Sequence, residues 1–122
     1  MKKTYETGLE GEKQAEEYLC ARKGMTCVER RFRAKCGEID LIMRDGGTLV
    51  FVEVKTRKTG APGFGIAAVD GRKQQRIARG AMTYLMSRRL VGAPVRFDVV
   101  EVCRGEITHI PNAFQPGNMF YR

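Results

Sequence analysis

Helical spacing of apolar residues predicts two helices. The first spans residues 7–23, with Thr7 and Glu10 placed as a capping box and Gly24 just beyond its end. The second spans residues 71–90, and its apolar positions are Ile77, Ala78, Ala81, Tyr84 and Leu85. Short apolar runs bounded by turn residues predict strands at 25–33, 38–44, 48–56 and 95–102, and a further strand at 106–110.

The order of these elements predicts an α/β fold. Helix, three strands, helix and two strands (α-β-β-β-α-β-β) favour a mixed β-sheet flanked by two helices. Asp45-Gly46-Gly47 is a turn signal, so the strands on either side of it should form an antiparallel hairpin. The second helix is long enough to serve as a crossover, which should bring the next strand into the sheet in parallel. No repeat or linker interrupts the 122 residues, so we expect a single domain over residues 1–122.

Charged side chains interrupt the most apolar strand, at residues 48–56. Residues 50, 52 and 54 are valines on one face, whereas Glu53 and Lys55 share the other face with two large apolar residues. A strand that is apolar on both faces is typically buried, and a buried charge is costly unless it is paired or binds a metal. The alternative is a simple Glu–Lys ion pair where the strand end meets water.

The preceding strand carries a second misplaced acid, Asp40, among Ile39, Leu41 and Ile42. The hairpin should place Asp40 beside Glu53, near the end remote from the turn. Two neighbouring carboxylates repel each other and raise each other's pKa unless a cation lies between them. Ligation by oxygen alone suits a hard cation, Mg²⁺ or Mn²⁺.

Glu12 is a third candidate metal ligand. At about 100° per residue it lies roughly 20° from Leu19 and roughly 60° from Leu9 on the helix, on the stripe that should face the core. The alternative is a solvated position at the border of that stripe.

Three acids around a divalent metal, with Lys55 beside them, favour phosphodiester hydrolysis. The metal would polarise the phosphate and lower the pKa of a bound water, while the lysine would stabilise the developing charge.

The balance of charged residues indicates what kind of molecule the protein binds. There are 22 Lys and Arg against 14 Asp and Glu, a net charge of +8, which favours a polyanion such as nucleic acid. Four cysteines without C-x-x-C spacing and a single histidine argue against a zinc site. The N-terminus is polar and no apolar run reaches membrane length, so we expect no membrane contact and a cytoplasmic location.

The acidic residues also carry a family resemblance. Asp40 followed after twelve residues by Glu53-Val54-Lys55 is similar to the PD-(D/E)xK nuclease motif. The segments 8–12, 37–42, 51–57 and 96–100 resemble the YraN family of small bacterial Holliday-junction-resolvase-like proteins. The resemblance implies a restriction-endonuclease-like core with Glu12, Asp40, Glu53 and Lys55 in one site.

Two positions depart from related patterns. Ile39 stands where the superfamily motif has proline before its first acid. Exonuclease-like relatives carry a tyrosine four residues after a helical glutamine, whereas Gln75 is followed at that spacing by Arg79. The resemblance therefore does not extend to processive exonuclease action.

Basic residues beyond the acidic site are candidates for contact with nucleic acid. These are Arg57, Lys58, Arg72, Lys73 and Arg76. Arg57 and Lys58 open a glycine-rich loop at 57–69, in which Phe64 is a candidate for stacking on a base. The alternative for Phe64 is ordinary packing. The other three lie at the start of the second helix, where the helix N-terminus also favours phosphate. The alternative for the helix is an ordinary solvated face.

Three classes of function follow. The first is a Mg²⁺- or Mn²⁺-dependent endonuclease acting on DNA, including branched or junction DNA. The second is a nucleic-acid-binding module with the nuclease fold and little catalysis of its own. The third is a structural protein whose acids form internal ion pairs. Cutting two strands with so small a domain would favour a homodimer.

Overall fold

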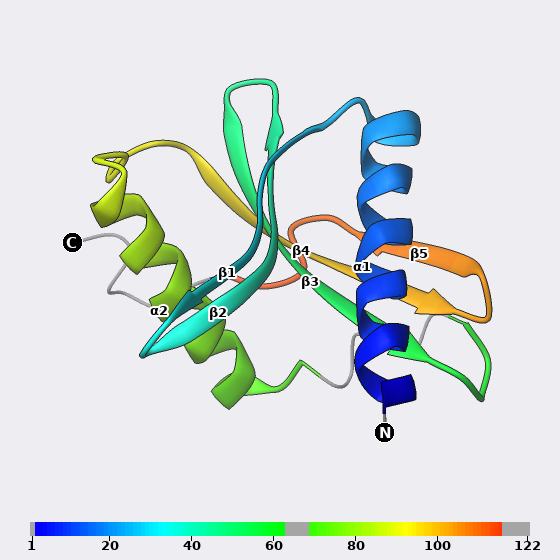
Figure 1. The fold of residues 1–122 in the computed structure, drawn as a ribbon. Helices are drawn as coiled ribbons and strands as arrows, with labels where there is room; N and C mark the ends of the chain where they lie inside the picture. The colour runs from blue at the N-terminus through cyan, green and yellow to red at the C-terminus, as the bar shows by residue number, and fades with distance from the viewer. Residues whose placement is uncertain (1, 63–68, 116–122) are drawn as a thin grey trace.

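A five-stranded mixed sheet forms the centre of the molecule, with one helix against each face (Figure 1). The computed structural model describes residues 2–62 and 69–115, with side chains from residue 8 onward. The elements are α1 (Lys2–Lys23), β1 (Thr26–Ala34), β2 (Gly37–Asp45), β3 (Thr48–Arg57), α2 (Gly71–Ser87), β4 (Val95–Cys103) and β5 (Glu106–Ile110). No helix among the described residues combines the length and the apolar character needed to cross a membrane.

The strand order β1-β2-β3-β4-β5 follows the sequence. The β2–β3 hairpin is antiparallel, with Asp45 opposite Thr48 and Gly46 in a left-handed conformation at the turn (φ 61°). After the α2 crossover, β4 joins β3 in parallel, and β5 returns antiparallel to β4. The predicted α/β class, element order and strand directions are confirmed.

The sheet has an apolar core on each side. The core beneath α1 contains Ala15, Leu19, Leu41, Met43, Val50, Val52, Val100 and Val102. The core beneath α2 contains Ile39, Ile42, Leu49, Phe51, Ile77, Ala81, Tyr84, Leu85, Phe97 and Val99. The predicted alternation along β3 is therefore confirmed, since its valines face α1 and its larger apolar residues face α2.

Both helices differ from prediction at one end. Helix α1 begins at Lys2, so Thr7 lies inside the helix and the predicted capping box is wrong. Helix α2 ends at Ser87 rather than at residue 90. Arg89 adopts a left-handed conformation (φ 57°), and the Leu90 amide donates to the Leu85 carbonyl at 2.7 Å, which closes the last turn.

Two glycines allow the helices to approach the strands that carry the acids. A Cβ on Gly37, the first residue of β2, would collide with the backbone carbonyl of Arg76 in α2. A Cβ on Gly11 in α1 would collide with the Thr56 side chain near the end of β3. These contacts bring the first half of each helix to the same end of the hairpin.

Candidate active site

Asp40 and Glu53 come together where the β2–β3 ladder ends. The last paired residues are Leu41 and Val52, and the two acids follow one step beyond them. The Val54 backbone N–H donates to Asp40 Oδ2 at 2.8 Å. The Asp40 side chain thus takes the hydrogen bond that a continuing β2 strand would have accepted, which confirms the predicted adjacency of the two acids.

The electrostatics of Asp40 reflect this crowding. Burial raises the pKa of Asp40 to about 7, and the negative charge of Glu53 adds to the shift, while the Val54 N–H partly opposes it. Glu12 raises the pKa of Asp40 further, to a smaller extent. A carboxyl group with this pKa is half protonated near neutral pH unless a cation neutralises the cluster.

Two lysines contact the carboxylate of Glu53, which is only 6% exposed. Lys55 Nζ lies 3.6 Å from Glu53 Oε2, and Lys73 Nζ lies 3.2 Å from the same oxygen. Burial lowers the pKa of Lys73, but the charge of Glu53 and the hydrogen bond to it outweigh burial and raise that pKa above its usual value. Lys73 comes from α2, so this contact joins the helix to the hairpin.

Glu12 lies on α1 at the edge of the same cluster. Its carboxylate accepts two hydrogen bonds from Arg31 of β1, at 2.7 Å from Nε and 3.3 Å from Nη2. Arg31 has a left-handed backbone (φ 51°), uncommon for a residue other than glycine. Glu12 is therefore partly buried, as the helical stripe predicted, but it faces an arginine rather than the other acids.

A cavity of about 430 Å³ unites the four residues predicted from sequence. Its charged lining residues are Glu12, Asp40, Glu53, Lys55, Lys58 and Lys73. A smaller cavity of about 40 Å³ adjoins Asp40, Glu53 and Lys73 and reaches Arg76. A larger cavity of about 600 Å³ lies between α2, the loop before β4 and the segment after β5. Its lining includes no acid from the described residues, so the larger cavity is not the one that holds the candidate catalytic residues.

The donor set fits a hard divalent cation. Asp40 and Glu53 offer carboxylate oxygens in a partly buried cavity, which suits Mg²⁺ or Mn²⁺ rather than a softer metal. Within residues 2–62 and 69–115, no three acidic, histidine or cysteine side chains stand together in ion-binding positions. Glu53 and Glu12 are instead paired with cations of the chain itself, Lys73 and Arg31.

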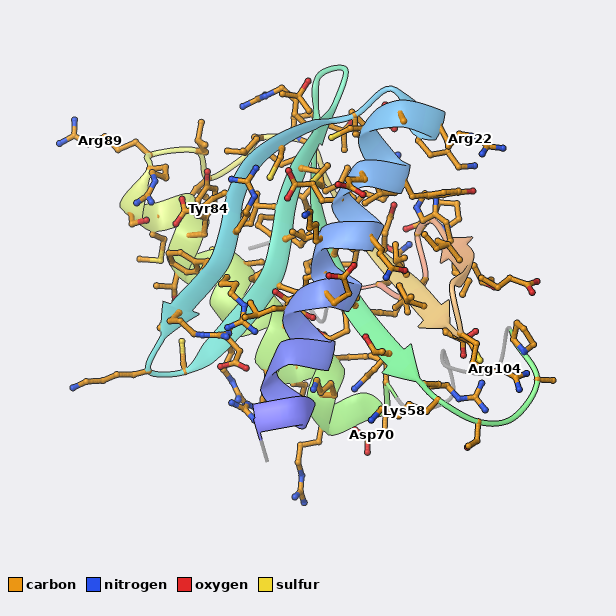
Figure 2. The ribbon with its side chains drawn as sticks, turned by 45° about the vertical axis from the view of Figure 1, so that its right-hand side comes forward. Arg22, Lys58, Asp70, Tyr84, Arg89 and Arg104 are labelled. Carbon is orange, nitrogen blue, oxygen red and sulfur yellow. The ribbon has the colours of Figure 1, made fainter. Side chains whose placement is uncertain are left out.

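The predicted nucleic-acid contacts divide into two groups. The Arg57 guanidinium donates to Glu101 Oε2 at 2.7 Å and to the Ala61 carbonyl at 2.9 Å, so its charge is engaged by the protein. Lys58 lines the cavity, and Figure 2 places it at the same end of the molecule as Asp70, the residue that caps α2. Phe64 lies outside the described residues.

Exposed arginines continue from the cavity along α2. Arg72, Arg76 and Arg79 are exposed, and none of them forms a salt bridge within the described parts of the chain. Helix α2 contains no Asp or Glu. These arginines at i, i+4 and i+7 form a positively charged stripe that begins beside Lys73.

Two buried acids on β4 have structural partners. Glu101 is fully buried against Arg57, a pair the sequence analysis missed although an acid within Val99-Val100-Glu101-Val102 was a signal of the same kind as Glu53. Asp98 is also fully buried. Its partner is Arg96 of the same strand, at 2.9 Å, together with His109 at 2.8 Å. The histidine thus helps to hold Asp98. Burial raises the pKa of Asp98, but the hydrogen bonds from His109 and Arg96 outweigh it and hold that pKa below its usual value.

Comparison with known proteins identifies the family. The sequence model of the uncharacterised protein family UPF0102 matches residues 11–102, which contain all four candidate catalytic residues and Lys73. The chain belongs to UPF0102. This is the YraN family, so the resemblance seen in the sequence is confirmed.

Relatives in UPF0102 match the chain over most of their length. A UPF0102 protein of Geotalea uraniireducens is 49% identical over 113 residues, covering 88% of each chain. One from Saccharophagus degradans is 45% identical over 115 residues, covering 93% of this chain and 97% of the relative. The crystal structure of SSO0001 matches with a TM-score of 0.39 at 18% identity, over 87% of this chain and 50% of that one.

Proposed function

We propose that this UPF0102 protein is a metal-dependent endonuclease that hydrolyses phosphodiester bonds in DNA. The observation that supports it most directly is the pair of a partly buried Asp40 and a buried Glu53, which lines a cavity together with Lys55 and Lys73. A structural protein gains nothing from two adjacent carboxylates, because one of them must be protonated or neutralised for the fold to be stable. The same pair is useful where a divalent cation meets a phosphate.

Asp40 and Glu53 would hold Mg²⁺ or Mn²⁺, with Glu12 as a further ligand once it leaves Arg31. The bound ion supplies charge to polarise the scissile phosphate and to acidify the attacking water. Lys55 projects from β3 on the same face as Glu53, and its position in the strand is fixed by parallel pairing with Glu101 of β4. From that position its ammonium group orients the water and stabilises negative charge that develops on the phosphate.

The arginine stripe of α2 would bind the DNA backbone. Arg72 and Arg79 are seven residues apart, a rise of about 10 Å along the helix, which equals about three base-pair rises along the axis of B-DNA. Lys58 also lines the cavity. Such contacts position the backbone without reading sequence, so they suit a substrate recognised by its structure, such as branched or junction DNA.

Cleavage of both strands of a junction would require two active sites, so for that substrate we infer a homodimer. We also propose a cytoplasmic location. All four cysteines, Cys20, Cys27, Cys36 and Cys103, are free thiols, which fits a reducing compartment.

A nucleic-acid-binding module without catalysis is the second candidate. It is favoured by the partners of the acids, because Glu12 faces Arg31 and Glu53 contacts two lysines. If those pairs are permanent, the cavity would offer a positively charged surface without room for a metal. The two candidates share binding to DNA and differ in metal-dependent cleavage.

The test is cleavage of labelled linear, flapped and four-way-junction DNA in Mg²⁺ or Mn²⁺. We expect the wild-type protein to cut at least one of these, and Glu53→Gln to lose cleavage while it still binds DNA. Glu106→Gln is the matched control, since Glu106 is an exposed acid on β5 outside the cavity. Binding without cleavage by the wild-type protein would favour the second candidate, and equal cleavage by Glu53→Gln would exclude this site.

A further inference from the structure

One carboxylate oxygen at the centre of the site has two ammonium groups beside it. Glu53 Oε2 lies 3.2 Å from Lys73 Nζ and 3.6 Å from Lys55 Nζ. A single negative charge requires only one such partner, and two ammonium groups on one oxygen repel each other. The second lysine therefore marks a position where the protein stabilises additional positive charge, next to an Asp40 carboxyl that is itself close to Glu53.

We propose that the Lys73 ammonium group occupies the cation position beside Glu53 in the metal-free protein and that a divalent ion displaces it. This inference rests on the proposed metal-dependent function and adds a residue to it. Lys73 is then a positioning residue that exchanges its contact with Glu53 for one with the substrate.

The surroundings of the two lysines indicate which one leaves. Lys55 belongs to β3, in the middle of the sheet, and its side chain is 24% exposed. Lys73 lies in the first turn of α2, with a side chain 41% exposed, and it borders both the main cavity and the small one. The greater access to solvent makes Lys73 the mobile partner.

The helix itself does not favour a lysine at this position. The first turn of a helix presents unpaired N–H groups with partial positive charge, which disfavours a cation there. Asp70 caps the helix by accepting from the backbone N–H of Lys73, at 3.0 Å. Glu53 is therefore the group that holds the ammonium end of Lys73 inside the cavity.

Displacement has a consequence for substrate binding. A divalent ion needs the same Glu53 oxygen and would add two positive charges beside the ammonium groups, so Lys73 must move away. Lys73 lies at the N-terminal end of α2, next to Arg72 and the arginine stripe. The released ammonium group would join the surface that we propose for the DNA backbone, so metal binding would strengthen phosphate binding at the cavity mouth.

The direct test is the affinity of the purified protein for Mn²⁺, measured by calorimetry and by the electron paramagnetic resonance signal of free Mn²⁺. Lys73→Met removes the competing cation, so we expect Mn²⁺ to bind about five- to tenfold more tightly than to the wild type. Lys58→Met is the matched control, because Lys58 lines the same cavity and forms no salt bridge with an acid of the described residues. Its loss should change the affinity less than about twofold.

A second measurement uses the wild-type protein alone. Acetylation of lysines, followed by mass spectrometry, should modify Lys73 faster in saturating Mg²⁺ than in a chelator, because the ion frees its amine. Lys55 should show no such increase.

The outcomes separate the two proposals. Equal or weaker Mn²⁺ binding by Lys73→Met, or unchanged acetylation of Lys73, would overturn the displacement and leave the metal-dependent function standing. Failure of the wild-type protein to bind Mn²⁺ would instead remove the metal site, and with it both proposals. Should Lys73→Met not fold, Lys73→Gln and the acetylation experiment decide the question.

Discussion

Replacing Asp40 by Asn in the metal-free protein should stabilise the fold in a pH-dependent manner. Asp40 is partly buried beside Glu53, and burial together with that neighbour raises its pKa to about 7. Asn has the same shape, and its carbonyl oxygen can still accept the hydrogen bond from the Val54 N–H. Its amide group can also donate to Glu53. The variant thus removes the charge while it keeps the local hydrogen bond.

Proton linkage determines whether the stability of the fold rises or falls with pH. An aspartate side chain in water has a pKa of 3.8, and the folded state raises the pKa of Asp40 to about 7. The folded protein therefore binds this proton more tightly than the unfolded chain, so stability is lost as the pH rises between these values. The raised pKa of Asp40 costs the fold about 2 kcal/mol at pH 5, where the folded state keeps the proton, and about 4 kcal/mol at pH 8, where Asp40 is ionised in both states.

Thermal unfolding in a chelator, at pH 5 and pH 8, measures the difference. The advantage of Asp40→Asn over the wild type should grow by about 2–3 kcal/mol between these pH values, or roughly 5–10 °C in Tm. Asp70→Asn is the control, because Asn also caps a helix well and this exposed acid should show no such trend. Saturating Mg²⁺ should raise the Tm of the wild type and leave that of Asp40→Asn unchanged. A stability difference that is the same at both pH values would refute the reasoning.

Three further outcomes are expected. Asp98→Asn should lower the free energy of unfolding by about 3–5 kcal/mol at neutral pH, since it leaves Arg96 without its buried partner. Chemical denaturation should show that the difference from the wild type becomes smaller in acid, because wild-type Asp98 then becomes protonated. Gly37→Ala should cost about 1–3 kcal/mol in the same assay, because the new Cβ meets the Arg76 carbonyl. Arg76→Ala should weaken DNA binding and reduce the slope of log K against log salt by about 0.9, measured by fluorescence anisotropy, whereas an unchanged slope would exclude a phosphate contact.

The arrangement of the sheet was predictable because local signals determine it. The turn at residues 45–47 sets the hairpin, and the alternation along β3 sets which face each side chain occupies. Register then brings Asp40 beside Glu53 without further information. The helix ends were less predictable, because Thr7 lies inside α1 rather than at its start and α2 ends at Ser87. The turn after α2 contains Arg89, whose left-handed backbone is unusual for a residue other than glycine.

The partners of the acids could not be predicted in the same way. Glu12 and Arg31 are 19 residues apart, and Glu53 and Lys73 belong to a strand and to the helix that crosses back over the sheet. Such contacts depend on how each helix lies across the sheet, which close approaches such as that of Gly37 control. Local sequence patterns identify a charge that needs a partner, but they do not identify that partner.

Exposure separates pairs that support the fold from pairs that a ligand can open. Glu101 has no exposed surface and Arg57 closes over it, so a solute cannot reach that carboxylate without unfolding the end of the strand. Glu53 keeps a small exposed area on a cavity, and its partner Lys73 is 41% exposed. Protonation of Asp40 and the cations beside Glu53 and Glu12 are separate means of neutralising one acidic cluster. A single divalent ion would replace all of them, which is why the partly exposed pairs, rather than the buried Glu101 pair, mark the site that we propose for the metal.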